Sequence, residues 1–223
     1  IKRMKHPYSQ AIGYVSLAWG AYQLERFSEM DQYSLKLIAL STEKEFNYYR
    51  GYGQLFQAVA KAWAGGYTEG LRLLDEAAVR IGSGQEVWLY QSLYGVMKSQ
   101  ILMDHGAYQR AADLAENIGV LSSEKKDVCY LPELLRLQSL GHEKLGNSDK
   151  ADELLQSAIE MARQMGANVF FLRAAEQQAR WGRGDGGTTA RRVLEEAMTR
   201  IDSAEPCPDI KRANKLRKSM AQL

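Results

Sequence analysis

The chain has 223 residues, of which 45% are hydrophobic and 25% charged, so it can build a sizeable apolar core. No apolar run approaches the roughly 20 residues that a membrane helix needs, and the start lacks a signal-peptide pattern. The net charge of +2 is concentrated at the two ends and leaves the body net negative, which disfavours nucleic acid as a partner. The sequence predicts a cytoplasmic protein with no membrane partner.

The cysteines and the first residues bear on the kind of protein. Cys129 and Cys207 stand far apart without a neighbouring Cys or His at metal-ligand spacing, which predicts two free thiols. The first residue, Ile1, is not methionine and helical periodicity starts almost at once. We therefore expect a fragment of a larger protein.

The chain repeats itself every 40 residues. Turn-forming glycines recur at that interval, namely Gly66, Gly106, Gly146 and Gly186. A leucine follows eight residues after each of them, at Leu74, Leu114, Leu154 and Leu194. This frame predicts five repeats at about 8–46, 47–84, 85–127, 128–166 and 167–205.

Helical periodicity within each repeat predicts a pair of helices. One apolar stripe, for example, contains Ala151, Leu154, Ala158 and Ala162. In chain order the predicted pairs are 8–24 and 27–44, 47–64 and 67–82, 85–104 and 107–121, 130–145 and 148–165, and 168–182 and 188–202. A basic helix is predicted at 208–221, and it begins at Pro208.

The turns supply start and stop signals for these helices. Thr68, Ser148 and Thr188 are expected to cap helix N-termini through their hydroxyl groups, and the preceding glycines to end the previous helices. Small residues such as Ala58 and Ala62 indicate close approach between helices.

The predicted fold is an all-α, tetratricopeptide-like right-handed superhelix of about five helix-turn-helix pairs, forming a single domain over 1–223. Ala151 and Ala158 match the two small-residue positions of the tetratricopeptide second helix. The terminal proline of that pattern is missing and each unit is longer than usual, so we expect a divergent relative.

Three stretches carry a resemblance to one family. They run from Tyr130 to Gly146, from Ala151 to Arg163 and from Gly166 to Ala175, and 6–9 and 208–211 look like the family's entry and exit. Together they resemble the C-terminal tetratricopeptide-like region of bacterial STAND-type signalling ATPases, which carry a nucleotide cyclase or a transcription-factor domain upstream. The resemblance implies a regulatory docking or sensor arm, and it transfers no catalytic residue.

The sequence offers no catalytic, metal or cofactor motif. The glycine-rich stretch 182–189 lacks the lysine of a phosphate loop, and His6, His105 and His142 lack metal-ligand spacing. The pairs Glu133 with Glu143 and Glu153 with Glu160 have no polarised nucleophile beside them. We therefore expect neither an enzyme nor a cofactor.

First helices line the inner groove of tetratricopeptide folds, and the frame assigns seven residues to that groove. Arginine suits a carboxylate-bearing peptide and aromatic residues suit an apolar anchor. The seven are Gln23, Phe56, Trp63, Gln100, Arg136, Arg173 and Arg180.

Two functions remain open at this point. The chain is either a scaffold that binds a protein or peptide, including the parent protein's own ATPase domain, or a sensor that encloses a small metabolite. An open groove would favour the scaffold, and a closed polar pocket the sensor. Nucleic-acid binding through the basic C-terminal helix is a third, weaker hypothesis.

Overall fold

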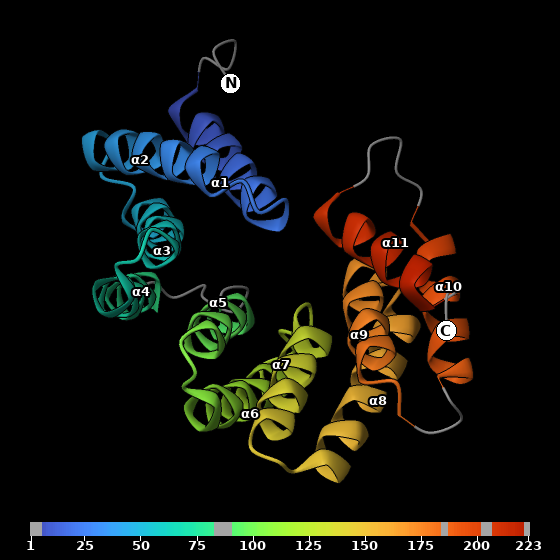
Figure 1. The fold of residues 1–223 in the computed structure, drawn as a ribbon. Helices are drawn as coiled ribbons and strands as arrows, with labels where there is room; N and C mark the ends of the chain where they lie inside the picture. The colour runs from blue at the N-terminus through green and yellow to red at the C-terminus, as the bar shows by residue number, and fades with distance from the viewer. Residues whose placement is uncertain (1–5, 83–90, 184–186, 202–206, 221–223) are drawn as a thin grey trace. The chain divides into compact units, whose positions relative to one another are not determined.

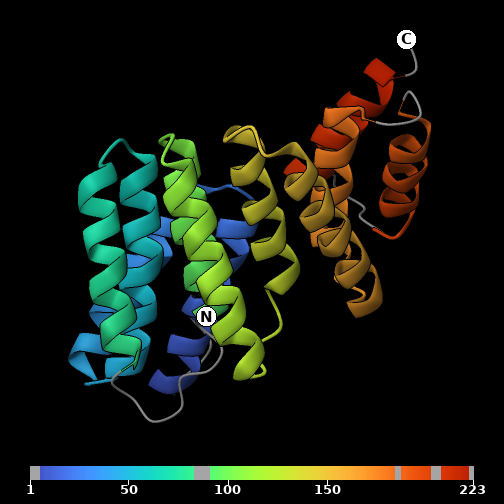
Figure 2. The ribbon, with the colours of Figure 1, turned by 90° about the horizontal axis from the view of Figure 1, so that it is seen from below.

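The computed structural model describes residues 6–82, 91–183, 187–201 and 207–220. Within these ranges the secondary structure consists of eleven α-helices and contains no strand, which confirms the all-α prediction. The helices run in sequential antiparallel pairs (Figures 1 and 2). The chain divides into two compact units, which are described separately.

Unit 1 comprises 1–107 and 124–127. Its helices are α1 (Pro7–Gln23), α2 (Phe27–Glu43), α3 (Asn47–Trp63), α4 (Tyr67–Gly82) and α5 (Gln91–Asp104). The predicted bounds agree within a few residues, and the predicted start of the fifth helix at 85 lies outside the described residues.

Unit 2 comprises 108–123 and 128–223. Its helices are α6 (Tyr108–Glu124), α7 (Leu131–Lys144), α8 (Ser148–Met165), α9 (Asn168–Trp181), α10 (Thr188–Thr199) and α11 (Pro208–Met220). The predicted ends at 202 and 221 lie outside the described residues. The repeat boundaries, the single domain and the right-handed superhelix stay predictions.

One turn geometry joins successive helices. The turns after α1, α2, α3, α7 and α8 each place one residue at positive φ, namely Glu25, Glu45, Gly65, Gly146 and Gly166. The amide of the following residue then donates to a carbonyl five positions back at 2.8–3.0 Å, as Phe46 does to Ser41. This bond satisfies a carbonyl at the helix end, and the next helix starts one residue later.

The predicted side-chain caps are not formed. The N-cap of α8 is Asn147 and that of α10 is Gly187, and neither helix has a side-chain cap hydrogen bond. Ser148 and Thr188 are instead the first residues of their helices, and Thr68 lies inside α4. For α4 and α8 the preceding turn is closed by a backbone hydrogen bond, and the hydroxyl residue lies inside the next helix instead of at its N-cap position.

In each unit one first helix packs between two second helices. α3 contacts α2 and α4, and also the first helices α1 and α5. In unit 2, α9 contacts α8 and α10, and also α7 and α11. α11 therefore occupies the place of a further first helix, and we call α7, α9 and α11 the first-helix layer of unit 2.

Small residues allow these helices to approach closely, as the sequence predicts. A Cβ added to Gly70 of α4 would lie 2.7 Å from Cβ of Ala62 and 2.9 Å from the carbonyl oxygen of Ala58 on α3. In unit 2 the buried core of α8, α9 and α10 includes Ala158 and Phe171, both fully buried. The close contacts fix the helices that carry the charged residues described next.

Candidate binding site on the first helices of unit 2

A buried carboxylate lies at the centre of the first-helix layer of unit 2. Glu133 of α7 is only 3% exposed, and Arg136, one turn later, donates to both of its oxygens at 2.8 and 2.9 Å. Arg173 of α9 approaches the same carboxylate at 3.5 Å. Burial alone would raise the pKa of Glu133, but the two guanidinium groups outweigh it and lower that pKa below its ordinary value.

Arg173 also links α9 to α11. It donates to both oxygens of Asp209 at 2.9 and 3.1 Å, and Arg212 donates to Asp209 at 2.5 Å. Burial would raise the pKa of Asp209, whereas the hydrogen bonds and charges of Arg173 and Arg212 lower it below its ordinary value. The ion pairs therefore hold α11 against α9 with its first-turn carboxylate ionised.

A second branch of the network reaches the surface. Glu176 of α9 is nearly buried, and Arg180 donates to it at 2.5 Å from Nη2 and 3.2 Å from Nε. Arg212 lies 3.8 Å from the other oxygen of Glu176. The side chains of Arg180 and Arg212 are 54% and 38% exposed, so they present guanidinium groups to solvent beside one carboxylate.

A series of hydrogen bonds that involves neutral side chains also joins α7 to α9. Arg136 donates to the side-chain oxygen of Gln177 at 2.9 Å, and Gln177 donates to Ser139 at 3.3 Å. The Ser139 hydroxyl in turn donates to the Ala151 carbonyl of α8 at 2.7 Å. Each side chain in this series is thus held in place by a hydrogen bond to another member.

Among the described residues, the network contains four guanidinium groups and three carboxylates. Its members are Glu133, Arg136, Arg173, Glu176, Arg180, Asp209 and Arg212. The balance leaves one excess positive charge, and the exposed members are cationic. Such a surface suits an anionic group of a partner.

A second cluster lies at the α7–α8 turn. Arg183 pairs with Glu143 and with Asp152, and the Ser148 hydroxyl donates to Glu143 at 3.1 Å. The hydrogen bond from Arg183 is the main reason that the pKa of Glu143 is lowered. These contacts connect the turn to the end of α9.

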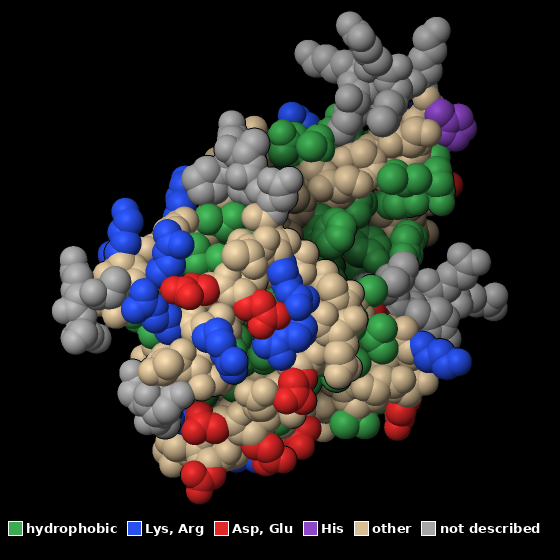
Figure 3. All heavy atoms as spheres, turned by 90° about the vertical axis from the view of Figure 1, so that its right-hand side faces the viewer, with side chains coloured by type: hydrophobic (Ala, Val, Ile, Leu, Met, Phe, Trp, Pro, Cys, Tyr) green, Lys and Arg blue, Asp and Glu red, His purple; other side chains and the backbone are tan. Residues whose placement is uncertain are grey.

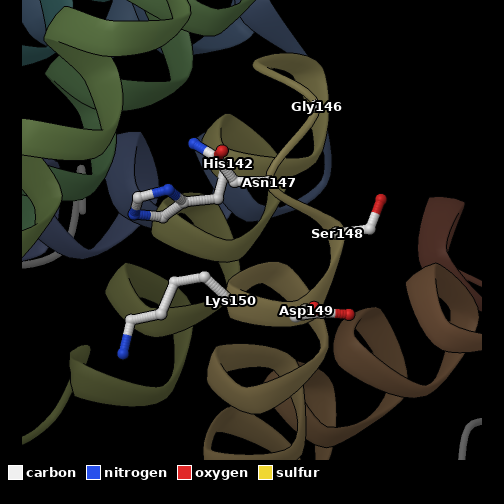
Figure 4. Close-up of a pocket in the computed structure, with 6 residues that line it drawn as sticks. All are labelled: His142, Gly146, Asn147, Ser148, Asp149 and Lys150. Carbon is white, nitrogen blue, oxygen red and sulfur yellow. The ribbon is translucent and has the colours of Figure 1, made fainter.

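An open depression of about 550 Å³ lies beside this turn. Its lining includes His142 and Lys150, which point to one side of the turn, and Ser148 and Asp149, which point to the other (Figure 4). Because these side chains do not converge on one point, the depression does not have the arrangement of a ligand-binding site.

The structure places the predicted groove residues of unit 1 in different environments. Phe56 is fully buried and is a core residue, so its assignment to the groove is corrected. Trp63 is 50% exposed and stacks on Phe27 with ring centroids 4.0 Å apart, lining an open depression of about 590 Å³. Gln100 donates to Asp104 at 2.9 Å, and Gln23 is half-buried.

The predicted groove residues of unit 2 lie together in the network. Arg180 is on the surface, whereas the side chains of Arg136 and Arg173 are only 13% and 16% exposed. Arg136 and Arg173 are therefore mainly structural, because each is committed to a buried carboxylate.

Sequence reasoning did not assign Glu133, Glu176, Asp209 or Arg212 to the site. A signal was present for two of them, because residues 40 positions apart carry opposite charges. Glu133 corresponds to Arg173, and Arg136 to Glu176. Adjacent first helices stack, so opposite charges at equivalent positions can pair across repeats.

The described ranges contain neither a metal-binding cluster nor a membrane-spanning helix. No group of three or more His, Cys, Asp or Glu side chains within them could hold a metal ion. None of the described helices is long and apolar enough to cross a membrane.

Comparison with known proteins identifies the fold. No family model and no curated protein matches the chain. Two crystal structures of a kinesin light chain-type protein from Podosopora anserina with nearly identical TPR-like repeats, one of them a single-substitution variant, are similar to it. Each has a TM-score of 0.52 and 16% identity, over 99% of this chain and 100% of that chain. This chain therefore has the tetratricopeptide-like (TPR-like) helical-repeat fold.

Proposed function

We propose that this chain is a non-catalytic scaffold that binds an acidic protein segment on the first-helix layer of unit 2. Folds of this type typically bind proteins or peptides and are usually not catalytic. The observation that carries the proposal is the pair of exposed guanidinium groups, Arg180 and Arg212, held on either side of the buried carboxylate of Glu176.

The geometry leaves Arg180 able to bind a second anion. Its Nε and Nη2 atoms donate to Glu176, and a guanidinium group has five N–H donors. A carboxylate of a partner can therefore accept from Arg180 without breaking the native ion pair. Because Glu176 fixes the guanidinium, little side-chain entropy is lost on binding.

Charge is mixed on the face of the molecule that Figure 3 draws. Lys and Arg side chains lie among Asp and Glu side chains on the face drawn in Figure 3. A nucleic-acid surface would require a continuous basic stripe. The mixture supports a protein partner over a nucleic acid.

A more specific proposal concerns the larger protein to which the chain would belong. We propose that the chain is the C-terminal arm of a STAND-type signalling ATPase and that its partner includes the parent's own ATPase domain. The support is the resemblance of 130–146, 151–163 and 166–175 to that family. In this arrangement the first-helix layer would report the state of the ATPase domain to an upstream output domain.

The small-ligand sensor has less support. The depressions beside Trp63 and at the α7–α8 turn are open to solvent, and an open surface favours docking. Trp63 and Gln100 remain candidates for a peptide contact in unit 1.

Charge reversal at Arg180 tests the proposed site. We expect Arg180→Glu to weaken binding of a fluorescent acidic peptide about tenfold or more, because a charge-assisted contact is replaced by repulsion. Arg180→Gln should give a smaller loss. Fluorescence anisotropy at low and high salt would measure both, and binding should weaken with salt.

Arg191→Glu is the matched control, because Arg191 is 46% exposed on the second helix α10 and pairs with Glu195. It should bind as the wild type does. Equal binding by wild type, Arg180→Glu and Arg191→Glu would remove the first-helix layer of unit 2 from the proposal.

A further inference from the structure

The helix α1 exposes positions that the later first helices α3, α5, α7 and α9 bury. Ile12 and Trp19 of α1 are each 46% exposed. In the 40-residue frame Ile12 corresponds to Tyr52, Ser92, Pro132 and Leu172, and Trp19 to Val59, Ser99, Ser139 and Ala179. All eight counterparts are buried. The exposed face of α1 thus corresponds to a face that is buried in α3, α5, α7 and α9.

The contacts of α1 with second helices differ from those of α3 and α9. α3 lies against second helices on two sides, α2 and α4, and α9 lies likewise against α8 and α10. In the described part of unit 1, α1 contacts one second helix, α2. The side of α1 that corresponds to the α2-facing side of α3 therefore has no second helix of unit 1 against it.

One glycine of α1 matches the glycine at the α2–α3 contact. A Cβ on Gly53 of α3 would lie 2.7 Å from Cγ1 of Ile38 and 3.2 Å from the carbonyl oxygen of Ser34, both on α2. Close approach of α2 thus requires glycine at position 53. Gly13 of α1 stands at the equivalent position.

The composition of α1 fits burial as well. The segment Pro7–Gln23 contains no Asp, Glu, Lys or Arg. Covering its outer face would remove Ile12 and Trp19 from water without desolvating a charge. An apolar helix face of this kind gains free energy when a second apolar stripe packs on it.

We propose that the face of α1 formed by Ile12, Gly13, Ser16 and Trp19 binds an amphipathic helix of the kind that α2 presents to α3. The repeat array then extends across α1 by continuing the established α2–α3 interface. The inference rests on unit 1 alone and does not depend on the peptide site proposed in unit 2.

A designed extension of the full chain tests the proposal. A copy of residues 27–46, which form α2 and its following turn, replaces residues 1–6, so that the copied helix enters α1 as α2 enters α3. We expect the thermal midpoint to rise by roughly 4 °C or more. The fluorescence of Trp19, obtained by difference from Trp19→Phe, should shift to the blue as the ring leaves water.

Ile12→Lys together with Ser16→Lys is the control in the extended chain, and it should abolish both changes. In the unextended chain the same pair should leave the midpoint nearly unchanged, because both side chains are exposed. An extension that leaves the midpoint and the Trp19 spectrum unaltered would overturn the proposal. So would sedimentation showing that the unextended chain dimerises and that Ile12→Lys abolishes the dimer, because the occupant would then be a second copy.

Discussion

Glu133 and Asp209 remain ionised although they are almost excluded from water, and arginine is the reason. Each carboxylate accepts a bidentate pair of hydrogen bonds, from Arg136 and Arg173 respectively. Removing one partner from such a pair leaves an uncompensated buried charge, which costs more than the pair contributes to stability. The network is therefore sensitive to single substitutions.

Glu133→Gln should lower the free energy of unfolding by about 3–5 kcal/mol at neutral pH, because Arg136 and Arg173 lose the carboxylate that neutralises them. Urea denaturation followed by circular dichroism would measure the change. Glu153→Gln is the control, since Glu153 is 68% exposed in its pair with Lys150, and it should change stability by less than about 1 kcal/mol. A Glu133→Gln protein as stable as the wild type would show that the network is not formed.

The contribution of Glu133 to the stability of the fold should decrease as the pH is lowered. Its pKa is lowered in the folded state, so the stabilisation is fully present above the unfolded-state pKa of about 4.3. It is lost as the pH falls through the lower folded-state pKa. The difference in stability between wild type and Glu133→Gln should therefore shrink on acidification, and a difference that grows in acid would contradict the assignment.

The charge network was partly predictable at the scale of residues. Two pairs of opposite charges lie 40 positions apart, Glu133 with Arg173 and Arg136 with Glu176, and the first of them is an ion pair in the structure. Asp209 was not predictable in this way, because its counterpart 40 positions earlier is Val169. Its role depends on α11 packing against α9, which the helical pattern does not specify.

At the scale of elements, turn geometry and close packing decide how the helices meet. Glu25 and Glu45 adopt positive φ where the turns after α3, α7 and α8 use glycine. Backbone bonds across each turn offset that strain. The sequence predicted the helices because their apolar period is strong, but it misassigned the caps because hydroxyl residues and backbone caps occur in the same few positions.

Gly70→Ala tests the close contact between α3 and α4. The added methyl group would overlap Ala62 and the Ala58 carbonyl, so stability should fall by about 1–3 kcal/mol. Gly20→Ala in α1 is the control, since a Cβ there has no atom within 4 Å, and it should be neutral or stabilising by up to about 1 kcal/mol. Equal denaturation midpoints for the two variants would contradict the packing described for α4.

At the scale of the whole molecule, a 40-residue spacing in the sequence predicts a succession of helix pairs. The proposed binding surface depends on which side chains the first helices leave exposed. The array could be predicted from spacing alone. The binding surface could not, because burial decides whether an arginine is structural, as with Arg136 and Arg173, or exposed, as with Arg180.

The central claim is that the first-helix layer of unit 2 binds an acidic segment and performs no chemistry. Amide hydrogen exchange of the wild-type chain, with and without a saturating acidic peptide, tests it most directly. We expect the peptide to slow amide exchange in α9 and α11 around Arg180 and Arg212. We also expect no turnover of ATP added to the same sample. Protection confined to the second helices α8 and α10, or nucleotide turnover by the purified chain, would contradict it.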